Sequence, residues 1–156
     1  MKPTHLPLRF NSIDQVLEAV ERLAAAETEG KLRSSGRWTL GQALNHLATW
    51  VDYAYEGFPL KIPFFLRWLG PLTKKRALSK PMKPGLRIPG IQGGTLATVV
   101  VPTADAMPHF RRSFARLSAQ APGDPHPILG TLTHEEWMAL HLRHAELHLS
   151  FLSTGE

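Results

Sequence analysis

The sequence contains no cysteine. A disulfide framework, a thiolate metal site and a cysteine nucleophile are therefore all excluded. Any transition metal that the chain holds tightly must be bound by histidine and carboxylate side chains instead. The chain has eight histidines, so imidazole ligands are available for such a site.

Long apolar runs are also missing from the sequence. No stretch approaches the roughly 20 apolar residues that a transmembrane helix needs, and the N-terminal residues lack the apolar core of a secretion signal. Apolar residues make up 43% of the 156 residues and charged residues 20%, a balance typical of globular proteins. We therefore expect a cytoplasmic protein with one domain, residues 1–156, and no membrane span.

Acidic residues are absent between Gly57 and Ala104, although the chain as a whole has 13. Eight of the 18 basic residues lie in this segment: Lys61, Arg67, Lys74, Lys75, Arg76, Lys80, Lys83 and Arg87. The remaining ten are outnumbered by the acids, so the net charge of +5 belongs to one central segment. Such a segment favours contact with an anionic partner.

Two stretches in the first third of the chain repeat apolar residues at the three- and four-residue spacing of a helix. The first begins at Asn11 and Ser12 and ends at Gly30, which is a common helix terminator. The second follows Thr39 and ends at Gly57. In both, a Ser or Thr precedes a Gln by three residues, which is the pattern of a capping box.

Two further helices are predicted in the last third of the chain. Thr103 is expected to cap the third, which ends before Pro122. The fourth spans Thr133 to Leu152, and its Thr133 and Glu136 form the clearest capping box of the sequence. Four long amphipathic helices predict an all-α fold, a four-helix bundle with one long connection between the second and third helices.

That connection, residues 58–102, is rich in proline and basic residues. Its seven prolines are spaced too closely for a long helix. A short helix is predicted from Phe64 to Ala77, with an apolar side made of Phe64, Phe65, Trp68, Leu69 and Leu72. Residues 95–102 are β-branched in character and are expected to be extended chain or a short strand. Irregular segments of this length are often lids or binding loops.

The last helix carries His141, His144 and His148 on the face where a buried helix normally has leucines. Burying an unpaired imidazole nitrogen costs on the order of 1–3 kcal/mol. Three such rings on one apolar stripe therefore require partners. A bound metal ion would satisfy several of them at once.

The spacing of these histidines decides which of them can share an ion. His144 and His148 lie one turn apart, close enough to chelate. His141 and His148 are roughly 10 Å apart along a straight helix, too far for one ion. His141 and His144 form a competing pair, so His141 is either an alternate ligand or a supporting residue. The third ligand must come from another helix, and His46 on the second is the candidate.

The other ionisable residues are assigned ordinary roles. His5, His109, His126 and His134 are expected at loop or surface positions, since a lone histidine is usually a hydrogen-bonded boundary residue. Three acidic residues lie near the candidate ligands in the sequence, and we expect all of them on the surface: Asp52, Glu56 and Glu146. No general base is therefore assigned.

Two segments resemble those of the DinB-like superfamily: WTLGQALNHLATW, which contains His46, and HLRHAELHLSF, which contains His144 and His148. Members are small four-helix-bundle proteins in which a histidine of the second helix and an H-x-x-x-H pair in the last helix bind a divalent metal. Many relatives have a doubled histidine followed by Gly-Gln, whereas here Leu147 precedes His148 and Leu149 follows it. The resemblance implies a metal site made of His46, His144 and His148.

The same resemblance implies a metal-dependent enzyme that activates water or a low-molecular-weight thiol, as a hydrolase or a thiol-dependent transferase. Histidine ligands suit Zn, Ni and Fe comparably, so the metal identity stays open. The expected partner is a small-molecule substrate, with a homodimer also open. A non-catalytic metal-binding or stress protein is one alternative.

The second alternative is an interaction module. Its basic segment, residues 61–87, would contact anionic lipid or nucleic acid, although no nucleic-acid motif accompanies it. The simpler interpretation makes the segment a lid that is packed over the bundle with its lysines in solvent.

Overall fold

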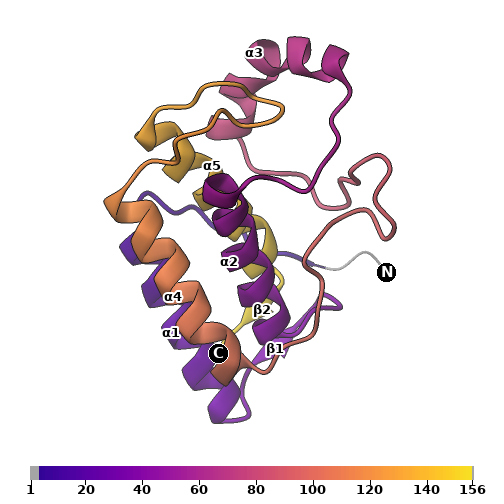
Figure 1. Ribbon diagram of the computed structural model, residues 1–156. Helices are drawn as coiled ribbons and strands as arrows, with labels where there is room; N and C mark the ends of the chain where they lie inside the picture. The colour runs from indigo at the N-terminus through magenta and orange to yellow at the C-terminus, as the bar shows by residue number, and fades with distance from the viewer. Residues whose placement is uncertain (1–3, 156) are drawn as a thin grey trace.

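The computed structural model describes residues 4–155, which are mainly helical (Figure 1). The helices are α1 (Ile13–Thr28), α2 (Leu40–Glu56), α3 (Phe64–Ser79), α4 (Thr103–Ala119) and α5 (His134–Leu149). Two short strands, β1 (Arg33–Ser34) and β2 (Leu152–Ser153), pair antiparallel. The all-α prediction is confirmed at this level, with the two-residue strands as a small addition.

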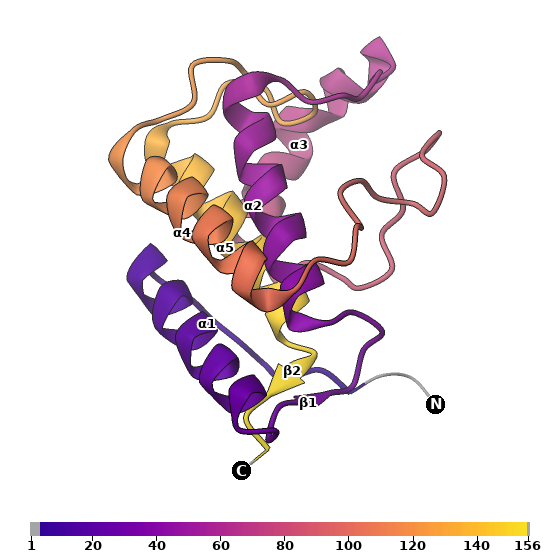
Figure 2. The same ribbon diagram turned by 60° about the horizontal axis from the view of Figure 1, so that its bottom comes forward.

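The core lies between α1, α2, α4 and α5. Helix α2 contacts α4 most extensively and also packs on α5, while α1 contacts both α4 and α5. Figures 1 and 2 show α1 and α4 side by side, with α2 crossing in front of α5. The largest side chains buried in this core are Trp137, Phe110, Phe114, Leu40, Leu44, Leu47, Leu117 and Leu149.

The predicted helix starts are largely confirmed by their caps. The Ser12 and Thr39 hydroxyls accept hydrogen bonds from the backbone N–H groups of Gln15 and Gln42. Thr133 and Glu136 form both hydrogen bonds of a capping box. Each cap satisfies backbone donors that the first helical turn leaves unpaired. The local sequence therefore determines where these three helices begin.

Two predicted helix boundaries are wrong. Thr103 does not cap α4 but is its first residue, because the carbonyl of Pro102 already accepts the N–H of Ala106. The last helix ends at Leu149 rather than Leu152. Leu152 leaves the helix because β2 pairs with β1, where Leu152 lies opposite Ser34. A tertiary pairing thus shortens a helix whose sequence pattern continues.

The segment before α1 is held by two buried charges on α5. Arg143 donates a hydrogen bond to the carbonyl of Phe10, and the Glu146 carboxylate accepts the N–H of Phe10. Arg143 and Glu146 also form an ion pair at 2.7 Å, with both side chains 4% exposed. The expectation that Glu146 lies on the surface is therefore wrong, because it anchors the N-terminal segment.

Helix α3 projects from one end of the molecule (Figures 1 and 2). It packs against the loop before α5 at Gly70, where a Cβ would overlap the carbonyl oxygen of Ile128. The predicted apolar side, by contrast, is exposed, so a lid that buries these side chains is not formed. Packing through a glycine brings the backbones together and leaves the bulky side chains on the opposite side.

No helix in residues 4–155 is long and apolar enough to cross a membrane.

The segment predicted as extended chain or a short strand, residues 95–102, forms no strand. It lies against α2, where the side chain of Gln42 donates to the carbonyl of Thr98 at 2.8 Å. This contact positions the chain beside the histidine of α2.

Candidate metal centre

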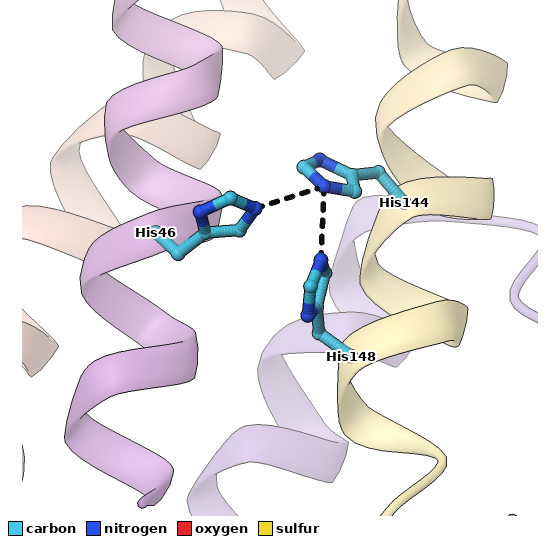
Figure 3. Close-up of side chains that lie close together, drawn as sticks. All are labelled: His46, His144 and His148. Atoms are coloured by element: carbon cyan, nitrogen blue, oxygen red, sulfur yellow. Dashed lines mark hydrogen bonds between the residues drawn. The ribbon is translucent and has the colours of Figure 1, made fainter. Parts of the chain in front are cut away.

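Three histidines converge between α2 and α5 (Figure 3). His144 Nε2 lies 3.2 Å from His46 Nε2 and 3.1 Å from His148 Nε2. One ring nitrogen from each residue lies within 4.8 Å of the other two, close enough to hold a metal ion. The structure thus brings together the three residues singled out in the sequence.

The separations of His144 Nε2 from His46 Nε2 and from His148 Nε2 fit the requirements of a metal. Nitrogen ligands about 2.05 Å from a tetrahedral ion lie roughly 3.3 Å from one another. A single hydrogen on His144 Nε2 can be directed at only one of its two neighbours, so hydrogen bonding leaves one of the close contacts unsatisfied. A cation would accept all three lone pairs at once.

The backbone beside α2 fixes the tautomer of His46. His46 Nδ1 lies 2.9 Å from the carbonyl oxygen of Leu96, so this nitrogen carries the hydrogen and donates it. The lone pair of a neutral ring is then on Nε2, directed at His144. A hydrogen bond of this kind, on the far nitrogen of the ring, commonly orients histidine ligands.

The turn that presents this carbonyl contains an unusual backbone conformation. Ala97 has a φ of 57°, in the left-handed region, which costs a residue with a Cβ roughly 1–2 kcal/mol. Its neighbours Leu96 and Thr98 both direct their carbonyls at α2. Sequence reasoning missed this contribution because a backbone carbonyl leaves no residue signature.

Trp38 is a second contributor that sequence reasoning missed. Its ring stacks on that of His148, with centroids 4.8 Å apart and planes 9° apart. It also contacts His46 edge-on at 4.8 Å. The indole therefore restricts the orientation of two of the three imidazoles. In the sequence, the only feature that pointed to a role for Trp38 was its position just before α2.

Burial keeps the three imidazoles neutral. It lowers the pKa of His46 to about 4 and that of His148 to about 3. The pKa of His144 is also well below its ordinary value, first because of burial and then because of the neighbouring histidines. Neutral rings have the free lone pairs that metal binding requires.

A cavity of about 910 Å³ opens beside the three histidines, and all of them line it. Its walls include apolar side chains from α2, α5 and the chain after α3, such as Trp50, Met82, Leu140 and Leu147. Among the residues from 4 to 155 that line it, none is Asp or Glu, and Arg37 adds a positive charge. The charge of a cation held by the imidazoles would therefore not be neutralised by a carboxylate of these lining residues.

The model of one protein family matches residues 3–154, almost the whole chain. The chain belongs to the family described as a protein of unknown function (DUF1569). No curated protein and no solved structure matches it significantly.

His141 is separate from the three converging histidines of this DUF1569 chain. It is 4% exposed, and its ring stacks on that of Trp137 at 6.1 Å. Burial lowers its pKa to about 3. Its Nε2 atom has no hydrogen-bond partner among residues 4–155, as is also true of Trp50 Nε1. Both residues line the cavity, although these two nitrogens are themselves buried.

His126 lies in the loop before α5, which agrees with the predicted loop or surface position, but it is half-buried. Its Nδ1 atom accepts the N–H groups of Ile128 and Leu129 at 3.1 and 3.0 Å. It also lines the cavity, and burial lowers its pKa to about 4. The loop before α5 folds back on itself through a bridge between His126 and Gly130, which the sequence did not reveal.

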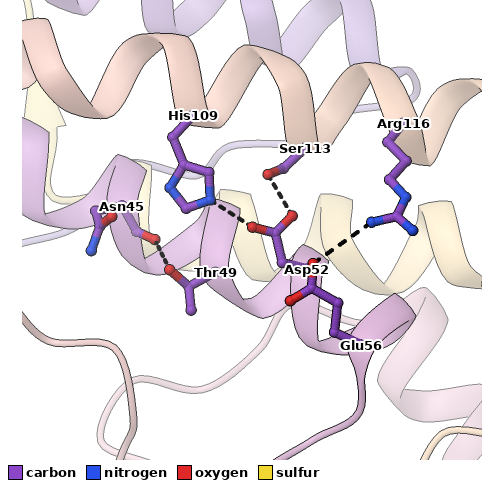
Figure 4. A network of polar contacts seen from close by, with 7 residues as sticks. All are labelled: Asn45, Thr49, Asp52, Glu56, His109, Ser113 and Arg116. Atoms are coloured by element: carbon purple, nitrogen blue, oxygen red, sulfur yellow. Dashed lines mark hydrogen bonds and ion pairs between the residues drawn. The ribbon is translucent and has the colours of Figure 1, made fainter.

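His109 lies within α4, and its side chain is partly exposed. Its Nε2 donates to Asp52 at 2.6 Å, and the Ser113 hydroxyl donates to the same carboxylate at 2.7 Å (Figure 4). A nucleophilic serine would need a hydrogen bond to the histidine, whereas here both residues bond to the aspartate. The network therefore links α2 to α4. Glu56 is exposed as predicted, 3.9 Å from Arg116.

The lowered histidine pKa values predict a pH-dependent stability for the metal-free protein. An unfolded histidine binds a proton near pH 6.5, while the buried rings stay neutral until pH 3 to 4. The unfolded state therefore gains protons first as the pH falls, and the folded state loses stability below pH 6.5. Urea unfolding with a chelator at pH 7.5 and 5.5 should show a decrease on the order of 1 kcal/mol per buried histidine.

A matched variant separates this effect from general charge repulsion. In His126→Asn the amide oxygen can accept the same N–H groups and does not titrate, so the decrease in stability should be smaller. Equal stability at the two pH values, or higher stability at pH 5.5, would contradict neutral buried imidazoles.

Proposed function

We propose that the protein is a metal-dependent enzyme, a hydrolase or a thiol-dependent transferase, whose divalent cation is held by His46, His144 and His148. The observation that carries the proposal is the convergence of their ring nitrogens, 3.1 and 3.2 Å apart, at the wall of a 910 Å³ cavity. A site that served only to stabilise the fold would have no need of an adjoining space for a substrate.

The donor set fits such a cation. Imidazole nitrogens suit Zn, Ni and Fe, and three protein ligands leave room for another molecule. When bound, the cation would act as a Lewis acid and activate water or a low-molecular-weight thiol. The chain's own contribution is to keep the imidazoles neutral by burial and to orient them through the Leu96 carbonyl and the Trp38 ring.

The cavity favours a substrate with an apolar body and a neutral or anionic reactive group. Its apolar walls would bury the body, and the absence of carboxylates among its described lining residues leaves positive charge uncompensated. Trp50 and His141 also line this cavity, although Trp50 Nε1 and His141 Nε2 are themselves buried. His141 would then belong to the wall of the substrate cavity rather than to the metal site.

The proposed likeness to the DinB-like superfamily is consistent with this assignment, because one histidine comes from α2 and a pair from α5. We also infer that α1, α2, α4 and α5 correspond to the four helices of its bundle. Residues 57–102 would then be the long proline-rich connection between the second and third of them. The contacts of α1 with α4 and α5, and of α2 with both, support that arrangement.

Turnover by the metal-loaded protein tests the proposal. Protein made without an affinity tag is loaded with Zn, Ni or Fe and assayed with low-molecular-weight thiols plus electrophiles, and with ester and amide substrates. We expect turnover that increases in proportion to bound metal and disappears on chelation. Trp50→Phe replaces an indole of the cavity wall by a smaller phenyl ring and removes no proposed metal ligand, so this variant should keep its metal but lose part of its turnover.

The outcomes distinguish enzyme from metal carrier. Stoichiometric metal with no turnover on any of these substrate classes would leave the non-catalytic metal-binding role. Equal turnover with and without metal would place the chemistry elsewhere in the chain.

A further inference from the structure

Helix α3 turns an apolar face to solvent. Five side chains at positions i, i+1, i+4, i+5 and i+8 form this face: Phe64 (74% exposed), Phe65 (57%), Trp68 (78%), Leu69 (48%) and Leu72 (80%). The opposite face packs on the rest of the molecule through Gly70 and Ala77. Large contiguous apolar patches are uncommon on soluble proteins and usually mark a contact site.

Unpaired positive charge surrounds this face. Lys61, Arg67, Lys75, Arg76 and Lys80 are exposed and make no salt bridge with any residue from 4 to 155. Lys74 is the exception, since it pairs with Glu136 at 2.8 Å. No acidic residue occurs between positions 57 and 104 to compensate these charges. A partner that covers the face must therefore supply both apolar surface and negative charge.

We propose that α3 and its flanking lysines and arginines form a docking surface for membranes that contain anionic phospholipid. Aromatic and leucine side chains would enter the boundary between headgroups and acyl chains, and the cations would pair with the headgroups. Because no helix of the described chain can span a bilayer, the protein lies on the surface. The position of α3 at one end of the molecule leaves it free to approach a flat surface (Figures 1 and 2).

Two other partners fit the surface less well. A second copy of the chain would bring the same basic face against itself, and the like charges would repel each other. Single-stranded nucleic acid could stack on Phe and Trp, but Leu69 and Leu72 offer no aromatic ring and are still exposed. Lipid satisfies the aliphatic, aromatic and cationic side chains together.

Vesicle co-sedimentation with the full chain tests the proposal. Vesicles of phosphatidylcholine alone are compared with vesicles that contain about a third phosphatidylserine. We expect binding to the anionic vesicles that weakens as salt is raised. Each basic residue near such a surface contributes a factor of about five to binding. Lys75→Gln with Arg76→Gln should therefore weaken binding about 25-fold, and Trp68→Ser with Leu72→Ser at least 10-fold.

Controls come from exposed residues outside α3. Val99→Ser with Val100→Ser changes two apolar side chains that are each 67% exposed. Arg22→Gln removes an exposed positive charge from α1. Both control variants should bind vesicles like the unaltered protein. Vesicle binding should also persist after chelation, because the ligands of the proposed metal are not involved. A failure of the membrane proposal can therefore be distinguished from a failure of the enzymatic proposal.

Trp68 provides a direct readout of insertion. It is the most exposed of the four tryptophans, since Trp137 is 1% exposed and the other two are half-buried. Its emission should shift to shorter wavelength on anionic vesicles and be quenched by lipids with brominated acyl chains, and Trp68→Phe should lose both responses.

The proposal is overturned if binding is equal on the two vesicle types or if Trp68 is not quenched. It is also overturned if the unaltered protein does not bind the vesicles and Trp68→Ser with Leu72→Ser either converts a dimer to a monomer or abolishes binding to single-stranded DNA.

Discussion

Replacing His144 by alanine is expected to lower the affinity for a divalent metal by about two orders of magnitude. His144 Nε2 lies between the other two ring nitrogens, at 3.1 and 3.2 Å, so its loss removes the central ligand. Structural zinc sites bind with 10–16 kcal/mol shared among four ligands, or roughly 3 kcal/mol each. Elemental analysis of untagged protein and titration with Zn, Ni and Fe would measure the change.

The matched control is His109→Ala, which removes a histidine that bonds only to Asp52 in the α2 and α4 contact. This variant should keep its metal, even if its stability is lower. Substoichiometric metal in the unaltered protein, together with unchanged metal binding in His144→Ala, would contradict the metal centre. Thermal unfolding adds a second measure, because bound metal should raise the Tm of the unaltered protein and not that of His144→Ala.

Replacing Arg143 by methionine should lower the free energy of unfolding by about 3–5 kcal/mol. Methionine approximates the length of the side chain but leaves the Glu146 carboxylate buried without its cation. One oxygen of that carboxylate already has no partner among residues 4–155. The backbone carbonyl of Phe10 loses its donor as well. Urea denaturation at neutral pH would measure the difference.

Arg111→Met is the control for this substitution. Arg111 also forms an ion pair with a glutamate, Glu21, but both side chains are about half exposed. Exposed pairs contribute between 0 and about 1 kcal/mol, so this variant should be nearly as stable as the unaltered protein. If the two variants lost equal stability, burial of the Arg143 and Glu146 pair would not be the cause.

Local sequence patterns predicted most of the helical segments. The caps at Ser12, Thr39 and Thr133 were recognised because a capping side chain satisfies its own helix, within three residues of chain. The helix predicted to begin at Phe64 was also recognised from nearby residues, despite the prolines around it. By contrast, the end of α5 was predicted wrongly, because β2 pairs with a strand more than a hundred residues away.

The candidate site was likewise predicted only in part. The four-residue spacing of His144 and His148 follows from helix geometry, and His46 was chosen as a histidine on the inward border of another helix. The contribution of Leu96 was not predictable, since any residue type supplies a carbonyl. His126 was correctly assigned to a loop or surface position, but nothing in the neighbouring residues indicates that its loop folds against the cavity.

By itself the sequence determined the helical character of the chain, the absence of thiol chemistry and the pair of histidines one turn apart. These properties depend on composition or on contacts within a few residues. Only the tertiary structure decided that His46 meets the pair, that His141 lies apart from it and that the apolar side of α3 faces solvent. These outcomes depend on how α2, α3 and α5 are oriented against their neighbours. A helix's own periodicity identifies its apolar side but not the surface that will cover it.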